Sequence, residues 1–164
     1  MSEFVLPASV VSKSDVSRLV IELEWVDNEI TAAAVRAGVG SESGSQPVYS
    51  VQLNDFLDKN KLSLEKGSER SEVIKQLRAF KSDAPVIHMT FAGAADRESL
   101  EQLTAWVREQ VNPQALIAVG VQPSLVGGVY IRTPNKVHDL SLRHAFDGRR
   151  DVLVKELEAL RVGK

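Results

Sequence analysis

The sequence contains no cysteine, which removes several classes of structure and chemistry at once. Disulfides, thiolate zinc sites, iron–sulfur ligation and cysteine nucleophiles all require cysteine thiols. A chain of 164 residues is nevertheless long enough to bury a core without such cross-links. We therefore expect a globular protein of a reducing compartment, without a thiol-based metal or cofactor site.

Aromatic residues and net charge are also scarce. Aromatic residues make up 5% of the sequence and the formal net charge is −2. Few aromatic side chains are therefore present to stack on nucleic-acid bases, and the electrostatic field of the net charge does not attract nucleic acid. No run approaches the roughly 18 apolar residues of a membrane span, and the first residues lack the pattern of a signal peptide. We expect a cytoplasmic protein that binds no nucleic acid.

Residues 12 to 37 carry the strongest helical signal. Apolar residues recur there at steps of three and four, and Ser12 and Asp15 have the spacing of a capping box. An amphipathic helix is therefore predicted, with Leu19 and Leu23 on its apolar stripe. Two uses of this stripe are open: it docks against a partner protein, or it completes a helical bundle.

The rest of the first half is predicted to hold a linker and two short helices. Residues 38–48 are rich in Gly and Ser, with glycines that miss the G-x-G-x-x-G spacing of a phosphate-binding loop. Apolar clusters within residues 51–81 then indicate the two helices. Residues 1–81 are accordingly predicted to form a helical N-terminal region.

From residue 85 the pattern changes to alternating strands and helices. A strand opened by Pro85, a helix ending near Asn112, and the apolar strand "ALIAVGV" follow one another. We expect the first two strands to be parallel and the apolar strand to be buried on both faces. A hairpin and a final helical stretch, which Gly148 is expected to weaken or kink in its middle, complete a small mixed β-α-β-β-β-α domain over residues 85–164. The predicted fold class is α+β.

The histidines do not form a convincing catalytic or metal-binding pattern. His138 and Asp139 are neighbours on a predicted strand, so their side chains point to opposite faces. The spacing from His138 to His144 matches no zinc motif, and no G-x-S-x-G elbow is present. Asp139 is better explained as a turn or cap acceptor. We predict no catalytic, cofactor-binding or metal-binding residues.

Gly127 and Gly128 stand just before an alternating strand, in the stretch "QPSLVGGVYIRTPNKVHDLSLR". A glycine pair at this place permits a positive-φ turn and a close approach of two backbones. A phosphate loop would instead lead into a helix N-terminus. The pair therefore has a sufficient structural explanation.

This stretch resembles the δ subunit of F-type ATP synthases, known in mitochondria as the oligomycin-sensitivity-conferring protein. In that family, a D-P-x-L-[IV]-G-G turn leads into a strand with an Arg, and then into a short turn and a K-V-x-D-x-S segment. The resemblance covers about residues 85–160. Its structural motif is carried here by Pro123, Leu125, Gly127, Gly128, Arg132 and Asp139.

The resemblance implies a non-catalytic peripheral-stalk subunit that joins the catalytic head to the stalk during proton-driven ATP synthesis. The implied partners are the b-type stalk subunit and, as a second candidate, the α subunits of the head. The membrane would be reached only through the complex, at its inner face. The partner-binding candidates are apolar residues of the last and first helices: Val152, Leu153, Leu157, Leu160, Leu19 and Leu23.

Two alternatives stay open at this point. The apolar residues of the last helix are expected mainly to pack on the domain's own sheet, which would leave few of them for a partner. The residues before position 85 are also fewer than the family's N-terminal helical bundle needs, which suggests a shortened or diverged member. A stand-alone adaptor with a δ-like domain is the alternative function.

Overall fold

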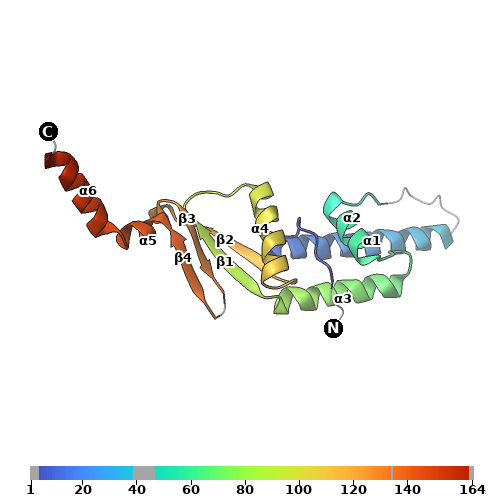
Figure 1. Ribbon diagram of the computed structural model, residues 1–164. Coiled ribbons are helices and arrows are strands. Elements are labelled where there is room, and N and C mark those ends of the chain that lie inside the picture. The colour runs from blue at the N-terminus through green and yellow to red at the C-terminus, as the bar shows by residue number, and fades with distance from the viewer. Residues whose placement is uncertain (1–3, 39–46, 134, 163–164) are drawn as a thin grey trace. The chain divides into compact units, whose positions relative to one another are not determined.

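The computed structural model describes residues 4–38, 47–133 and 135–162, without the side chains at 153, 156 and 160–162 (Figure 1). Contacts between Cα atoms divide the chain into two compact units. The helical unit comprises Met1–Pro85 with Arg97–Leu116, and the sheet unit comprises Val86–Asp96 with Ile117–Lys164. The predicted α+β class, with N-terminal helices followed by a small mixed sheet, is confirmed.

Helix α1 (Lys13–Gly38) begins at the predicted capping box. The backbone N–H of Asp15 donates to the hydroxyl of Ser12 at 3.3 Å, and the backbone N–H of Ser12 donates to a carboxylate oxygen of Asp15 at 2.9 Å. These bonds satisfy donors that a first helical turn otherwise leaves open. The predicted apolar stripe is buried at Val16, Leu19, Val20, Leu23 and Val26.

Two further helices follow, α2 (Val51–Asn60) and α3 (Gly67–Asp83). Both were predicted, but α3 is longer than the apolar cluster that indicated it, because exposed polar residues extend its first turns. The predicted linker at 38–48 lies mostly outside the described residues. The division into domains at residues 81–85 stays a prediction, and the contacts group α4 (Arg97–Gln110) with the earlier helices.

Helices α1 and α3 pack antiparallel to each other. Near one end of the pair, the Lys13 ammonium donates to the carbonyl of Ser82 at 3.3 Å. Further along, the Arg70 guanidinium pairs with Asp27 at 2.6 Å and donates to the carbonyl of Leu64 at 2.7 Å. Arg70 is only 5% exposed. A charge buried to that degree is tolerated because it is both paired and hydrogen-bonded.

Arg108 on α4 holds the N-terminal segment, residues 4–12, against α4 within the helical unit. Burial lowers the pKa of Arg108 to about 10, so its guanidinium remains charged at neutral pH. Among the described residues, its hydrogen-bond partners are backbone carbonyls and include no carboxylate. The guanidinium donates to Pro7 at 2.7 Å, Ala115 at 3.1 Å, Leu6 at 3.4 Å and Val10.

The sheet contains four strands in the order β2-β1-β3-β4. They are β1 (Val86–Phe91), β2 (Leu116–Val121), β3 (Gly128–Arg132) and β4 (Val137–Ser141). β3 pairs antiparallel with both β1 and β4. The β3–β4 hairpin closes where the backbone N–H of Thr133 donates to the carbonyl of Lys136 at 2.8 Å. The predicted hairpin is therefore confirmed.

β2 runs parallel to β1, as predicted. The backbone N–H of Leu116 donates to Pro85 at the start of both strands, and that of Gln122 donates to Phe91 at their ends. The predicted burial of β2 on both faces is wrong. Only its first half is buried, and Val119 and Val121, which share one face of the strand, are 42% and 55% exposed because that face is not covered along its second half.

The chain after β4 forms two helices, α5 (Leu142–Asp147) and α6 (Arg150–Val162), separated at Gly148 (Figure 1). The sequence predicted helix with a weak point at this glycine, and the break confirms it. We call α5 and α6 together the C-terminal arm.

Candidate protein-binding surfaces

The described residues hold no group of three or more His, Asp or Glu side chains arranged to bind a metal ion. His138 lies opposite Ile131 in the β3–β4 ladder, whereas Asp139 lies opposite Tyr130. Paired residues of adjacent strands share a face, and successive residues of one strand do not. His138 and Asp139 therefore face opposite sides of the sheet, as expected from the sequence.

Asp139 acts as a cap acceptor where β4 passes into α5. Its carboxylate accepts from the backbone N–H of Ser141 at 3.0 Å, and the Ser141 hydroxyl accepts from the backbone N–H of His144 at 3.2 Å. Hydrogen bonding to the Ser141 side chain and backbone, with smaller contributions from the charges of His144 and Arg143, lowers the pKa of Asp139. This chain of contacts explains the Asp and Ser of the motif as helix-starting residues.

The glycine pair is required by its surroundings. Gly128 has φ of +80°, and a Cβ on it would collide with the backbone carbonyl of Leu140 in the partner strand. A Cβ on Gly127 would lie 2.7 Å from Cδ1 of Leu142, the first residue of α5. Both glycines thus allow close packing within the sheet unit, which agrees with the structural explanation drawn from the sequence.

The other motif residues build the turn before β3. Pro123 begins a short 3-10 turn, Pro123–Leu125, and Leu125 is 7% exposed. Arg132 ends β3 on the surface, between His88 and Val137 of the adjacent strands. Leu125 is therefore a packing residue, whereas the Arg132 guanidinium is available at the surface.

Val126 follows this turn with φ of +67°, in a region that β-branched residues rarely adopt. Its side chain is 69% exposed. This conformation was not predicted, because a valine between Leu125 and Gly127 has the high strand propensity of a β-branched residue.

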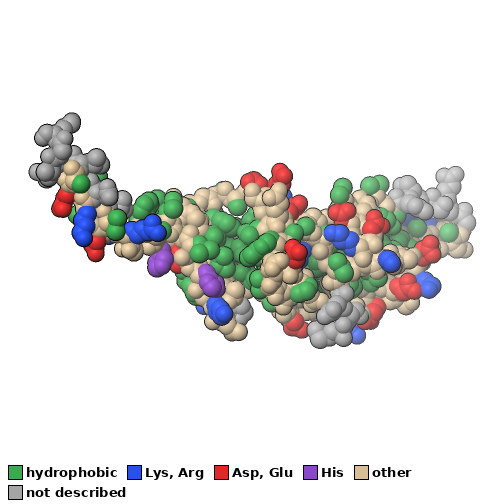
Figure 2. Space-filling model, in the orientation of Figure 1, with side chains coloured by type: hydrophobic (Ala, Val, Ile, Leu, Met, Phe, Trp, Pro, Cys, Tyr) green, Lys and Arg blue, Asp and Glu red, His purple; other side chains and the backbone are tan. Residues whose placement is uncertain are grey.

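The C-terminal arm exposes a series of large apolar side chains (Figure 2). The prediction that most of its apolar residues pack on the sheet is wrong for the described ones, because α6 extends beyond the strands that would cover it. The side chains of Leu153 and Leu160 lie outside the described residues. Exposed fractions are 47% for Leu142, 51% for Phe146, 59% for Val152, 46% for Val154 and 64% for Leu157.

Leu19 and Leu23 do not form a docking surface. Both are 0% exposed, in the core of the helical unit. Of the two uses considered for the α1 stripe, the structure supports the bundle. Burial distinguishes these uses, whereas periodicity does not, because a buried stripe and a docking stripe have the same spacing.

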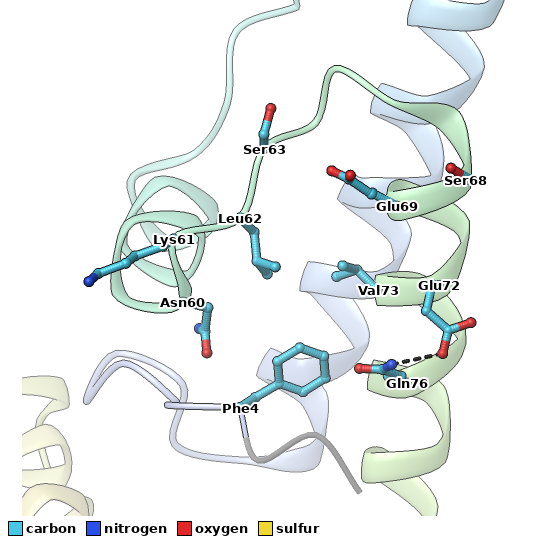
Figure 3. Close-up of a pocket in the computed structure, with 10 residues that line it drawn as sticks. All are labelled: Phe4, Asn60, Lys61, Leu62, Ser63, Ser68, Glu69, Glu72, Val73 and Gln76. Carbon is cyan, nitrogen blue, oxygen red and sulfur yellow. Dashed lines mark hydrogen bonds between the residues drawn. The ribbon is translucent and has the colours of Figure 1, made fainter.

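An open hollow of ≈ 560 Å³ lies on the helical unit between α3, the end of α2 and the N-terminal segment (Figure 3). The Phe4 ring points into it toward Val73. On α3, the Gln76 side-chain amide donates a hydrogen bond to the Glu72 carboxylate at 2.7 Å. Phe4 also contacts Phe56, with ring centroids 5.5 Å apart. The hollow combines an apolar floor with a polar rim and brings no catalytic set of side chains together.

No helix in the described ranges is long and apolar enough to cross a bilayer. No curated protein matches the chain. A comparison with protein families matches residues 8–151 to the family described as "ATP synthase delta (OSCP) subunit". The match begins within the helical unit, so it extends the resemblance seen in the second half of the sequence to most of the chain. The chain belongs to the ATP synthase delta (OSCP) subunit family.

Proposed function

We propose that this protein is the stator subunit that joins the catalytic head of an F-type ATP synthase to its peripheral stalk. The family match supports a structural, non-catalytic subunit of that enzyme complex. In this role the chain has no active site of its own, and it reaches the inner face of the membrane only through the complex. Its partners are the b-type stalk subunit and the α subunits of the head.

The observation that carries this proposal is the exposed apolar surface of the C-terminal arm. Leu142 and Phe146 are one helical turn apart on α5, and Val154 and Leu157 lie close together on one side of α6. Each is at least 46% exposed. Large apolar side chains grouped in this way are typical of surfaces that bind another helix. We assign this surface to the stalk subunit.

Calorimetric titration of the full chain with the soluble part of the stalk subunit from the same organism tests the assignment. We expect saturable one-to-one binding that is lost when the chain is truncated before Leu142. Phe146→Asp and Leu157→Asp should each weaken binding by about tenfold or more, since a charge would be buried at the interface.

Val35→Asp is the matched control, because Val35 is 66% exposed on α1 in the helical unit. It should leave the affinity for the stalk segment unchanged. Equal losses of affinity for the stalk segment in Val35→Asp and Leu157→Asp would mean that the arm is not the stalk-binding surface. Failure of the intact chain to bind at all would favour the stand-alone adaptor.

A further inference from the structure

Charge is unevenly distributed along this chain. Residues 128–164 contain eight Lys and Arg against five Asp and Glu, a formal charge of +3. Residues 1–127 contain twelve Lys and Arg against seventeen Asp and Glu, a formal charge of −5. Although the formal net charge of the chain is −2, the segment that includes the β3–β4 hairpin and the C-terminal arm is basic.

Two arginines concentrate this charge where α5 gives way to α6. Arg149 and Arg150 directly follow Gly148, and both are exposed. Within the described part of the chain neither forms an ion pair, whereas the nearby Arg143 lies 4.0 Å from the carboxylate of Asp147. An exposed guanidinium without a carboxylate partner has its donors available for another molecule.

Arg150 lies next to the exposed apolar residues of α6. Arg150, Val154 and Leu157 are spaced by four and three residues on α6, which places them on one side of the helix. Figure 2 shows basic and apolar side chains next to one another along the arm. A partner that covers Val154 and Leu157 therefore also meets a guanidinium at the start of α6.

The neighbouring side of α6 is charged with both signs. Asp151, Lys155 and Glu158 are exposed and also spaced by four and three residues. A helix that lies on an anionic membrane normally carries mainly Lys and Arg on its polar face. An anionic membrane surface covering α6 would meet both carboxylates, whereas a partner helix can contact the side that carries Arg150 alone, so the charge pattern favours a protein partner over a membrane.

We propose that the arm recognises an acidic amphipathic helix, whose carboxylates pair with Arg149 and Arg150 while its apolar face covers Phe146, Val154 and Leu157. This inference rests on the proposed function, because it specifies the chemistry of the stalk segment that binds the same surface. Arginine binds carboxylate through two parallel hydrogen bonds, so the pair fixes the position of the helix as well as attracting it.

Two designed helical peptides of about 20 residues, long enough to lie along both helices, serve as probes. Both carry the same leucine stripe; one is flanked by Glu and the other by Lys. Fluorescence anisotropy with the full chain should show at least about tenfold tighter binding of the Glu peptide. Raising the salt concentration from about 0.05 M to 0.5 M should reduce this preference severalfold.

Arg149→Glu/Arg150→Glu should abolish or reverse the preference. Arg149→Gln/Arg150→Gln should remove it with less effect on the fold, which circular dichroism checks. Lys75→Glu/Lys81→Glu is the matched control: it makes the same charge change on α3, at two exposed lysines without an ion pair among the described residues. It should leave the preference unchanged.

Equal binding of the two peptides would overturn the inference, and so would binding to phosphatidylserine vesicles in preference to the Glu peptide. Titration with the stalk segment separates this failure from failure of the proposed function. If the segment binds wild type and Arg149→Glu/Arg150→Glu equally well, the stator function stands and the acidic-partner inference is wrong. If the segment does not bind wild type, the stator function itself fails.

Discussion

Leu142 and Gly127 are in contact through both backbone and side chain. The backbone N–H of Leu142 donates to the carbonyl of Gly127 at 2.9 Å, and Leu142 Cδ1 occupies the space that a Cβ on Gly127 would need. The turn before β3 and the first residue of α5 are thereby joined directly. The orientation of α5 depends on a position more than a dozen residues earlier in the chain.

Gly127→Ala should reduce the free energy of unfolding by about 1–2 kcal/mol, because its methyl group would displace the Leu142 side chain. In the double variant Gly127→Ala/Leu142→Ala the shortened side chain leaves room for that methyl. We therefore expect the double variant to lose less than the sum of the two single losses, as measured by urea denaturation. Additive losses would show that the two residues do not interact.

Val126→Gly should stabilise the protein by about 1 kcal/mol. Glycine removes the strain of a β-branched residue at φ of +67°, which exceeds the entropy that glycine gains in the unfolded chain. Little burial is lost, since the Val126 side chain is 69% exposed. Val121→Gly, on the exposed part of β2, is the control and should instead destabilise. Thermal unfolding should therefore show a higher melting temperature for Val126→Gly and a lower one for Val121→Gly.

Arg108→Met should cost about 2–4 kcal/mol of stability, because backbone carbonyls that now accept from the guanidinium would lose a charged donor. Methionine keeps much of the aliphatic volume, so the loss reports hydrogen bonding more than packing. Arg36→Met is the control, since Arg36 is 49% exposed and 3.8 Å from Glu29. Hydrogen exchange should further show weakened protection of residues 4–12. Equal costs for the two substitutions would contradict the role given to Arg108.

Asp15 should contribute to acid sensitivity. Burial disfavours its charged form, but hydrogen bonds from the Ser12 backbone and side chain and the Arg97 charge outweigh burial and lower the pKa of Asp15. A lowered folded-state pKa means that the stabilisation is fully present above the ordinary aspartate pKa of 3.8 and is lost as the pH falls through the folded-state pKa.

Asp15→Asn should therefore cost about 1–2 kcal/mol at pH 7 and progressively less below pH 4, as the wild type loses the same charge. Urea denaturation at a series of pH values measures the difference. A difference that stays constant down to pH 2 would show that the Asp15 charge has no role.

Local patterns predicted the elements whose determinants lie close together in the sequence. Ser12 and Asp15 are three residues apart, and their capping box was identified for that reason. Gly127 and Gly128 indicated a tight turn because few other residues fit one. The break near Gly148 was predicted from the low helix propensity of glycine.

Features that depend on distant residues were missed. The run "ALIAVGV" predicts a buried strand, but whether Val119 and Val121 are covered depends on what distant part of the chain packs on their face of the sheet. The role of Arg108 could not be predicted from the sequence, because its hydrogen-bond acceptors are backbone carbonyls, which every residue provides. The last helix was named as a candidate partner surface, but its exposure was not predicted, since a helix that packs on its own sheet and one that binds a partner have the same periodicity.

The Arg108 contacts have a consequence for how the N-terminal segment tolerates sequence change. Since the guanidinium binds carbonyl oxygens, exchange of buried Leu6 or Val10 for another apolar side chain of similar size leaves every acceptor in place. Insertion or deletion of a single residue between Leu6 and Val10 would instead shift those carbonyls relative to one another. The Arg108 contacts therefore constrain the length of the segment more than they constrain the identity of its side chains.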